Sequence, residues 1–160
     1  ETISPSMDIQ IASNFERLIF DLNDKNSEQT SKDMMKIKEE GKYSIDKEKL
    51  NLINQDFLSA RMSETETLDI IRSVYEEFNI VLDPHTAIGY GAFDKHDLNG
   101  NNIVLATAHP CKFPDAIQSA INIKAELPNE LQFILNEKEN YDILENDIEK
   151  VKEHIKERSK

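Results

Sequence analysis

The segment 103–113 constrains the fold most, because a short apolar run within it ends abruptly in a hydroxyl, a histidine, a proline and a lysine. Residues 103–105 are aliphatic or β-branched and follow the turn-forming run 99–102, so we predict a short buried strand here. In open α/β sheets, ligands bind outside the carboxyl ends of such strands. Thr107, just beyond this predicted strand, is therefore the first candidate for a residue that binds a ligand.

Most of the remaining sequence has the periodicity of amphipathic helices. Two capping boxes, at 13–16 and 63–66, place a serine three residues before a glutamate, so that both side chains satisfy free backbone amides. They predict one helix from about residue 14 and another over 64–79, the second being the most deeply packed. The apolar run 80–82 is strand-like. Start and stop residues predict further helices over 27–40, after Asp46, after Pro84, after Pro114, after Pro128 and from Leu144.

The helix predicted after residue 83 has an unusual composition. Asp83 is a good N-cap, and Gly89 and Gly91 each cost a helix about 1 kcal/mol relative to alanine, so we expect this helix to pack closely on a neighbour. Two interpretations of its start stay open. The free backbone amides beside His85 suit a bound anion, whereas Asp83 and Thr86 could simply cap the helix.

Composition excludes several classes of function. The chain has 31 acidic and 19 basic residues and no basic stripe, which argues against binding nucleic acid. It contains neither a signal peptide nor an apolar run of about eighteen residues, so no membrane association is predicted. The single Cys111 cannot form an internal disulfide and is consistent with a reducing, cytoplasmic location. No metal site is predicted, because the histidines and the cysteine lack the spacing of metal ligands.

Four motifs follow one another along the chain: SPSMDI at 4–9, SNFER at 13–17, DPHTAIG at 83–89 and TAHPxKF at 107–113. In this order they resemble the motifs of threonine synthase, in the branch with the longer C-terminal region found in bacteria and fungi. Weaker similarities at 57–63 and 127–131 extend the resemblance over nearly the whole chain.

The resemblance implies an α/β fold: the helix-rich C-terminal part of a tryptophan synthase β-like, pyridoxal-phosphate-dependent enzyme, with few strands in this segment. Residues 1–125 would belong to the cofactor-binding α/β domain and residues 126–160 to a C-terminal helical extension. The implied reaction converts O-phospho-L-homoserine and water to L-threonine and phosphate, with the cofactor pyridoxal 5'-phosphate acting as the electron sink.

The resemblance also implies roles for individual residues. Thr107 matches the hydroxyl residue that is hydrogen-bonded to the pyridine nitrogen of the cofactor. Asp83 and His85 match a segment beside the cofactor ring. His109 and Lys112 belong to the motif that contains Thr107, and they are candidates for contacts with the substrate or with residues that support the site.

The family's Schiff-base lysine and its phosphate-binding loop match nothing in this sequence, and Lys112 belongs to a different motif. We therefore expect a piece of a longer protein that contains no catalytic residue, is inactive alone and self-associates through exposed apolar surface. Two alternatives stay open: a helical interaction module without chemistry, and part of another pyridoxal-phosphate lyase of the same fold.

Overall fold

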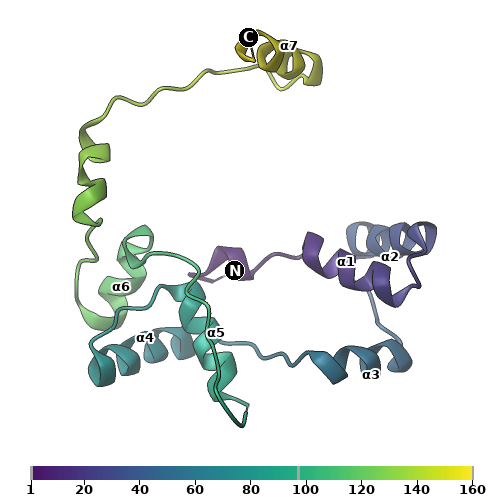
Figure 1. The fold of residues 1–160 in the computed structure, drawn as a ribbon, viewed down its shortest axis with the longest axis horizontal. Coiled ribbons are helices and arrows are strands. Elements are labelled where there is room, and N and C mark those ends of the chain that lie inside the picture. The colour runs from purple at the N-terminus through teal and green to yellow at the C-terminus, as the bar shows by residue number, and fades with distance from the viewer. Residues whose placement is uncertain (1, 97, 160) are drawn as a thin grey trace. The chain divides into compact units, whose positions relative to one another are not determined.

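The computed structural model of the chain describes residues 2–96 and 98–159. Contacts divide the chain into two units, Glu1–Glu126 and Leu127–Lys160. The first contains η1 (Pro5–Met7), α1 (Ser13–Leu22), α2 (Ser27–Glu40), α3 (Lys47–Asp56), α4 (Glu64–Phe78), α5 (Pro84–Asp94), η2 (Pro110–Lys112) and α6 (Pro114–Ile121), and the second contains η3 (Asn129–Asn136) and α7 (Ile148–Arg158) (Figure 1). The roles predicted for residues 1–125 and 126–160 stay predictions.

The structure is rich in helices, as predicted, but the described residues form no β-strand. The buried strand predicted at 103–105 is wrong: Ile103 is 88% exposed and Leu105 is 74% exposed. The strand-like run 80–82 likewise belongs to neither a helix nor a strand. The physical reason is that a strand is defined by hydrogen bonds to a neighbour, and the described residues supply no neighbouring strand to either segment.

Helix starts follow local signals with one exception. At α4, the Ser63 Oγ accepts from the Glu66 amide at 3.3 Å while the Glu66 carboxylate accepts from the Ser63 amide at 2.7 Å, which confirms this capping box. The box predicted at Ser13 is wrong, because Ser13 is already the first helical residue and Ala12 is the N-cap. The Glu16 amide is instead bonded to the Ala12 carbonyl oxygen at 3.0 Å.

Helices α1, α2 and α3 are joined by a buried polar cluster around Asn23, Thr30 and Asp33. The side-chain Nδ2 of Asn23 donates to both Thr30 Oγ1 and Asp33 Oδ2 at 3.1 Å. The Lys49 ammonium of α3 donates to Asn23 Oδ1 at 2.7 Å. The predicted end of α2 is confirmed, since Gly41 takes the left-handed conformation at φ 70°. These contacts hold the three helices together without a large apolar core.

The apolar core of the first unit lies where α4 packs on both α5 and α6. Its buried members come from all three helices: Ile71, Ala87, Ile117 and Ala120. Contrary to our expectation, α4 is not the most deeply packed helix, because α5 buries more residues, including most of its first turn. The burial of that turn is what places polar side chains inside the protein, as described below.

Close packing of α5 is confirmed at one of its two glycines. A Cβ added at Gly91 would collide with the side-chain ends of Ile70 and Met62, whereas a Cβ at Gly89 would meet only Val104 Cγ1 at an ordinary 3.6 Å. At Gly91, α5 thus lies against the ends of two flexible side chains, which would have to shift for a larger residue, whereas Gly89 has room for a Cβ.

The second unit has little buried surface. The helix predicted after Pro128 is a 3₁₀ helix without buried residues. The last helix starts at Ile148 rather than at Leu144, because the Asp147 side chain caps it by accepting from two backbone amides at 2.9 and 3.0 Å. Across the described part of the chain, every helix is too short or too polar to cross a bilayer.

Gly91→Ala and Gly89→Ala form a matched pair for testing the α4–α5 contact. Both substitutions gain the same helix propensity, but only the first makes the ends of the Ile70 and Met62 side chains shift, so we expect Gly91→Ala to be about 1 kcal/mol less stable than Gly89→Ala. Denaturant unfolding of the chain measures the difference. Adding Met62→Ala should relieve part of the loss at Gly91, and equal stabilities of the two single variants would contradict the contact.

The ion pair between Glu66 of α4 and Lys95 at the end of α5 predicts a dependence on pH. Their 2.7 Å contact, together with hydrogen bonds from Ser63, lowers the pKa of Glu66 from 4.5 to about 2. Stability from this carboxylate is fully present above about pH 4.5 and is lost as the pH falls toward 2. We expect Glu66→Gln to flatten that part of the unfolding profile, and a Glu66 carboxyl that titrates near 4.5 by NMR would contradict the pairing.

Candidate functional site

The site is built at the start of α5 around the carboxylate of Asp83, which is only 1% exposed. Asp83 Oδ1 accepts from the backbone amides of His85 at 2.9 Å and Thr86 at 3.4 Å, and Oδ2 accepts from the Thr86 hydroxyl. These donors, together with the positive end of the helix dipole, offset the cost of burying the carboxylate. The N-cap predicted at Asp83 is thus confirmed.

His85 is buried and both of its ring nitrogens are engaged by protein groups. Its Nδ1 lies 3.2 Å from Asp83 Oδ1, and its Nε2 accepts from the Ser6 amide at 3.2 Å. These two contacts together require a neutral ring with the proton on Nδ1. The ring also packs on Phe113, with centroids 4.8 Å apart. His85 therefore anchors the N-terminal turn η1 to α5 and has no ring nitrogen left for a ligand in this arrangement.

Thr86 connects Asp83 to Thr107, the residue that the sequence places first among ligand-binding candidates. The Thr86 Oγ1 accepts from the Thr107 amide at 3.0 Å and lies 3.5 Å from Thr107 Oγ1. Thr107 itself is exposed, so its hydroxyl can reach a ligand. The sequence predicts Thr86 only as a possible helix cap, because its spacing to Asp83 is a local signal, whereas its contact with Thr107 spans 21 positions and has no local signal.

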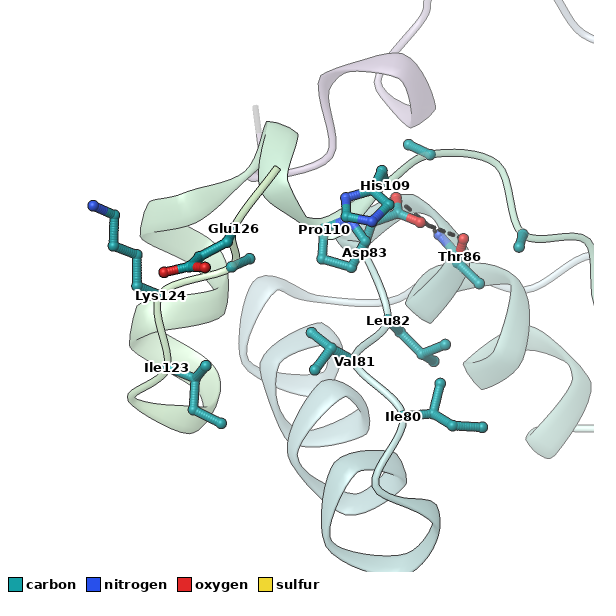
Figure 2. Close-up of a pocket in the computed structure, with 13 residues that line it drawn as sticks. Ile80, Val81, Leu82, Asp83, Thr86, His109, Pro110, Ile123, Lys124 and Glu126 are labelled. Carbon is teal, nitrogen blue, oxygen red and sulfur yellow. Dashed lines mark hydrogen bonds between the residues drawn. The ribbon is translucent and has the colours of Figure 1, made fainter. Parts of the chain in front are cut away.

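A pocket of about 630 Å³ opens beside this network. Figure 2 shows Asp83, Thr86 and His109 among the side chains around it, with the apolar run 80–82 below and the segment 123–126 across the pocket. Thr107 is not one of its lining residues but lines a neighbouring pocket of about 350 Å³ together with His85 and Gly89. The carboxylate network therefore lies between two hollows of the surface.

The structure brings most, but not all, of the predicted site residues together. Asp83, His85 and Thr107 belong to one hydrogen-bonded network, and His109 lines the same pocket as Asp83. The His109 Nδ1 accepts from the Cys111 amide at 3.2 Å and so caps the turn η2. Lys112 is exposed and lines neither pocket. Whether any of these residues binds a ligand stays a prediction.

The site offers a hydrogen-bond donor whose backbone is bonded to a buried polar network. Within residues 2–96 and 98–159, no group of three or more histidine, cysteine, aspartate or glutamate side chains is placed to hold a metal ion. The network presents an exposed hydroxyl at Thr107 and a buried carboxylate behind it. Such an arrangement can orient a neutral polar group of a ligand.

Substitution of Asp83 tests how far the network depends on its carboxylate. We expect Asp83→Ala to destabilise the chain by about 2–3 kcal/mol, because it removes a cap and also leaves buried donors unsatisfied. The matched control is Asp46→Ala, which removes the exposed cap of α3 and should cost about 1 kcal/mol. Urea unfolding of both variants gives the comparison, and equal losses would argue against a special role for Asp83.

Comparison with known proteins identifies relatives for nearly the whole chain. A family model described as "Threonine synthase, C-terminal" matches residues 86–155. Threonine synthase from Pseudomonas aeruginosa is 36% identical over 157 residues, which cover 96% of this chain and 34% of that protein. Threonine synthase from Saccharomyces cerevisiae is 35% identical over 182 residues, which cover 98% of this chain and 35% of that protein.

A solved structure is similar as well. The X-ray structure of a threonine synthase from Brucella melitensis with pyridoxal phosphate bound matches all of this chain at a TM-score of 0.82 and 37% identity. This chain covers 35% of that protein. It thus spans about a third of the length of the relatives that it matches.

Proposed function

Because the chain belongs to the threonine synthase family and corresponds to its C-terminal region, we propose that it forms part of an enzyme that converts O-phospho-L-homoserine and water to L-threonine and phosphate. The observation that carries this proposal is the similarity to enzymes of that name over nearly the entire chain, at more than a third of positions identical. The activity belongs to complete enzymes of this family, and this chain spans about a third of the length of the relatives described above.

The proposed cofactor is pyridoxal phosphate, which when bound supplies an electron sink for a carbanion. The residues of the site fit this group at one point, the pyridine nitrogen. A ring nitrogen can form one hydrogen bond in the plane of the ring, and the Thr107 hydroxyl is exposed while its backbone amide is held by Thr86. We assign Thr107 to that nitrogen. A hydroxyl, unlike a carboxylate, leaves the ring less fully protonated and so moderates how strongly it withdraws electrons.

Other residues of the chain would support this contact. Asp83 and His85 hold the surroundings of Thr107 from within the protein, and His109 faces the larger pocket, where it is available to a substrate. Lys112 is exposed and suits a contact with the substrate phosphate. The Schiff-base lysine and the phosphate-binding loop would be supplied by residues other than 1–160, so this chain alone is expected to be inactive.

We further propose that the extended segments 80–82 and 103–105 become strands of an α/β sheet in the complete enzyme. Support comes from their β-branched composition and from the exposure of Ile80, Ile103 and Leu105, which are apolar side chains without a covering element among the described residues. In the chain alone, the same residues favour self-association. A cytoplasmic location stays a prediction.

The proposed function is tested in the complete enzyme that contains residues 1–160. We expect Thr107→Ala to lower kcat about tenfold to a hundredfold, as expected for the loss of one hydrogen bond to a reacting system, while Thr107→Ser retains activity. Phosphate release from O-phospho-L-homoserine provides the assay. An unchanged rate in Thr107→Ala would favour a helical interaction module, and turnover by the 160-residue chain alone would overturn the expected inactivity.

A further inference from the structure

The direction of the hydrogen bonds around Thr86 is fixed by its neighbours. Asp83 accepts backbone amides at the start of α5 and acts as an acceptor for the Thr86 hydroxyl. A threonine hydroxyl has only one proton, and here Asp83 takes it. The lone pairs of Thr86 Oγ1 remain, and one of them accepts the Thr107 amide at 3.0 Å. Thr86 therefore cannot donate to Thr107.

This order of donors determines what Thr107 can offer. The Thr86 Oγ1 lies 3.5 Å from Thr107 Oγ1, at the long end of a hydrogen bond, and it can only accept there. The proton of the exposed Thr107 hydroxyl is thus held weakly and is free to turn toward a ligand. A ligand atom with a lone pair, such as an unprotonated ring nitrogen, would receive it.

The same contact fixes the position of Thr107. The segment 103–108 belongs to no helix or strand, and the Thr86 hydroxyl is the partner of the Thr107 amide. Because Thr86 is buried in the first turn of α5 and bonded to Asp83, residue 107 is tied to a buried, hydrogen-bonded helix start. Without this bond, the backbone at residue 107 would have to become ordered when a ligand binds.

We propose that Asp83 and Thr86 form a positioning pair, in which Asp83 orients the Thr86 hydroxyl so that Thr86 holds the Thr107 backbone and leaves the Thr107 hydroxyl free to donate to the cofactor ring. This inference rests on the proposed function, because Thr107 is taken as the residue that meets the ring nitrogen. Asp83 and Thr86 act through Thr107 and do not themselves contact the cofactor.

The first test needs no cofactor. Amide hydrogen exchange, measured by NMR on the 160-residue chain, should show Thr107 protected at least tenfold relative to the amides at 105 and 106, which lack a comparable hydroxyl partner among the described residues. Thr86→Val, which keeps the shape but removes the oxygen, should abolish that protection, and Thr86→Ser should retain it. A wild-type Thr107 amide that exchanges as fast as its neighbours overturns the proposal, even where Thr86→Val does not fold.

The second test uses the complete enzyme with pyridoxal phosphate. We expect Thr86→Val to lower kcat about tenfold, to change KM less than twofold and to shift the pH dependence of the visible absorption of the bound cofactor. Thr86→Ser should recover activity to within about threefold. A purely structural role would lower thermal stability without moving the absorption.

Thr107→Ala separates failure of this inference from failure of the proposed function. If Thr107→Ala impairs the enzyme and Thr86→Val leaves kcat and the absorption unchanged, the positioning pair is wrong while the role of Thr107 survives. If Thr107→Ala changes neither kcat nor the absorption, the assignment of Thr107 to the ring nitrogen fails, and the positioning pair has no function to support.

Discussion

The candidate site depends on one buried charge, the carboxylate of Asp83. An ionised group without partners would cost several kcal/mol to bury, so its position is tolerated only because amides, an imidazole and a hydroxyl converge on it. Two of these donor side chains also bond to other parts of the chain. The His85 ring accepts from the Ser6 amide, and the Thr86 hydroxyl oxygen accepts from the Thr107 amide. A single carboxylate thereby ties together segments far apart in the sequence.

The burial of that carboxylate follows from how α5 packs. Gly91 lies against the side-chain ends of Ile70 and Met62, and Ala87 lies in the core that α5 forms with α4 and α6. The first turn of the same helix lies inside the protein, because the residues from Pro84 to Ala87 are all buried. Outside this core, the pair between Lys95 and Glu66 joins the end of α5 to the start of α4. Packing of apolar groups thus determines where the polar network forms.

Local sequence signals predicted the helix caps well. Contacts between residues far apart in the sequence could not be predicted in this way. The caps at Asp46, Ser63 and Asp83 were correct, because a cap depends on residues within about four positions. The strand at 103–105 was wrong, because its hydrogen-bond partners are not among the described residues. At the site, the bond between Asp83 and the start of its helix was predictable, whereas the role of Thr86 was not. Thr107 itself was singled out by its place after an apolar run and by the family resemblance.

The contrast between Thr107 and the residues before it bears on how the chain would contribute to a complete enzyme. Ile103 and Leu105 are exposed, yet the segment that contains them is held at Thr107 by a hydrogen bond to Thr86. A hydroxyl that is already in place avoids part of the entropy cost of ordering a ligand contact. Residues 103–105 remain available to pair with a neighbouring strand. On this basis, the chain would contribute a donor whose backbone is already positioned, while the neighbouring strands, the Schiff-base lysine and the phosphate-binding loop would come from other residues of the enzyme.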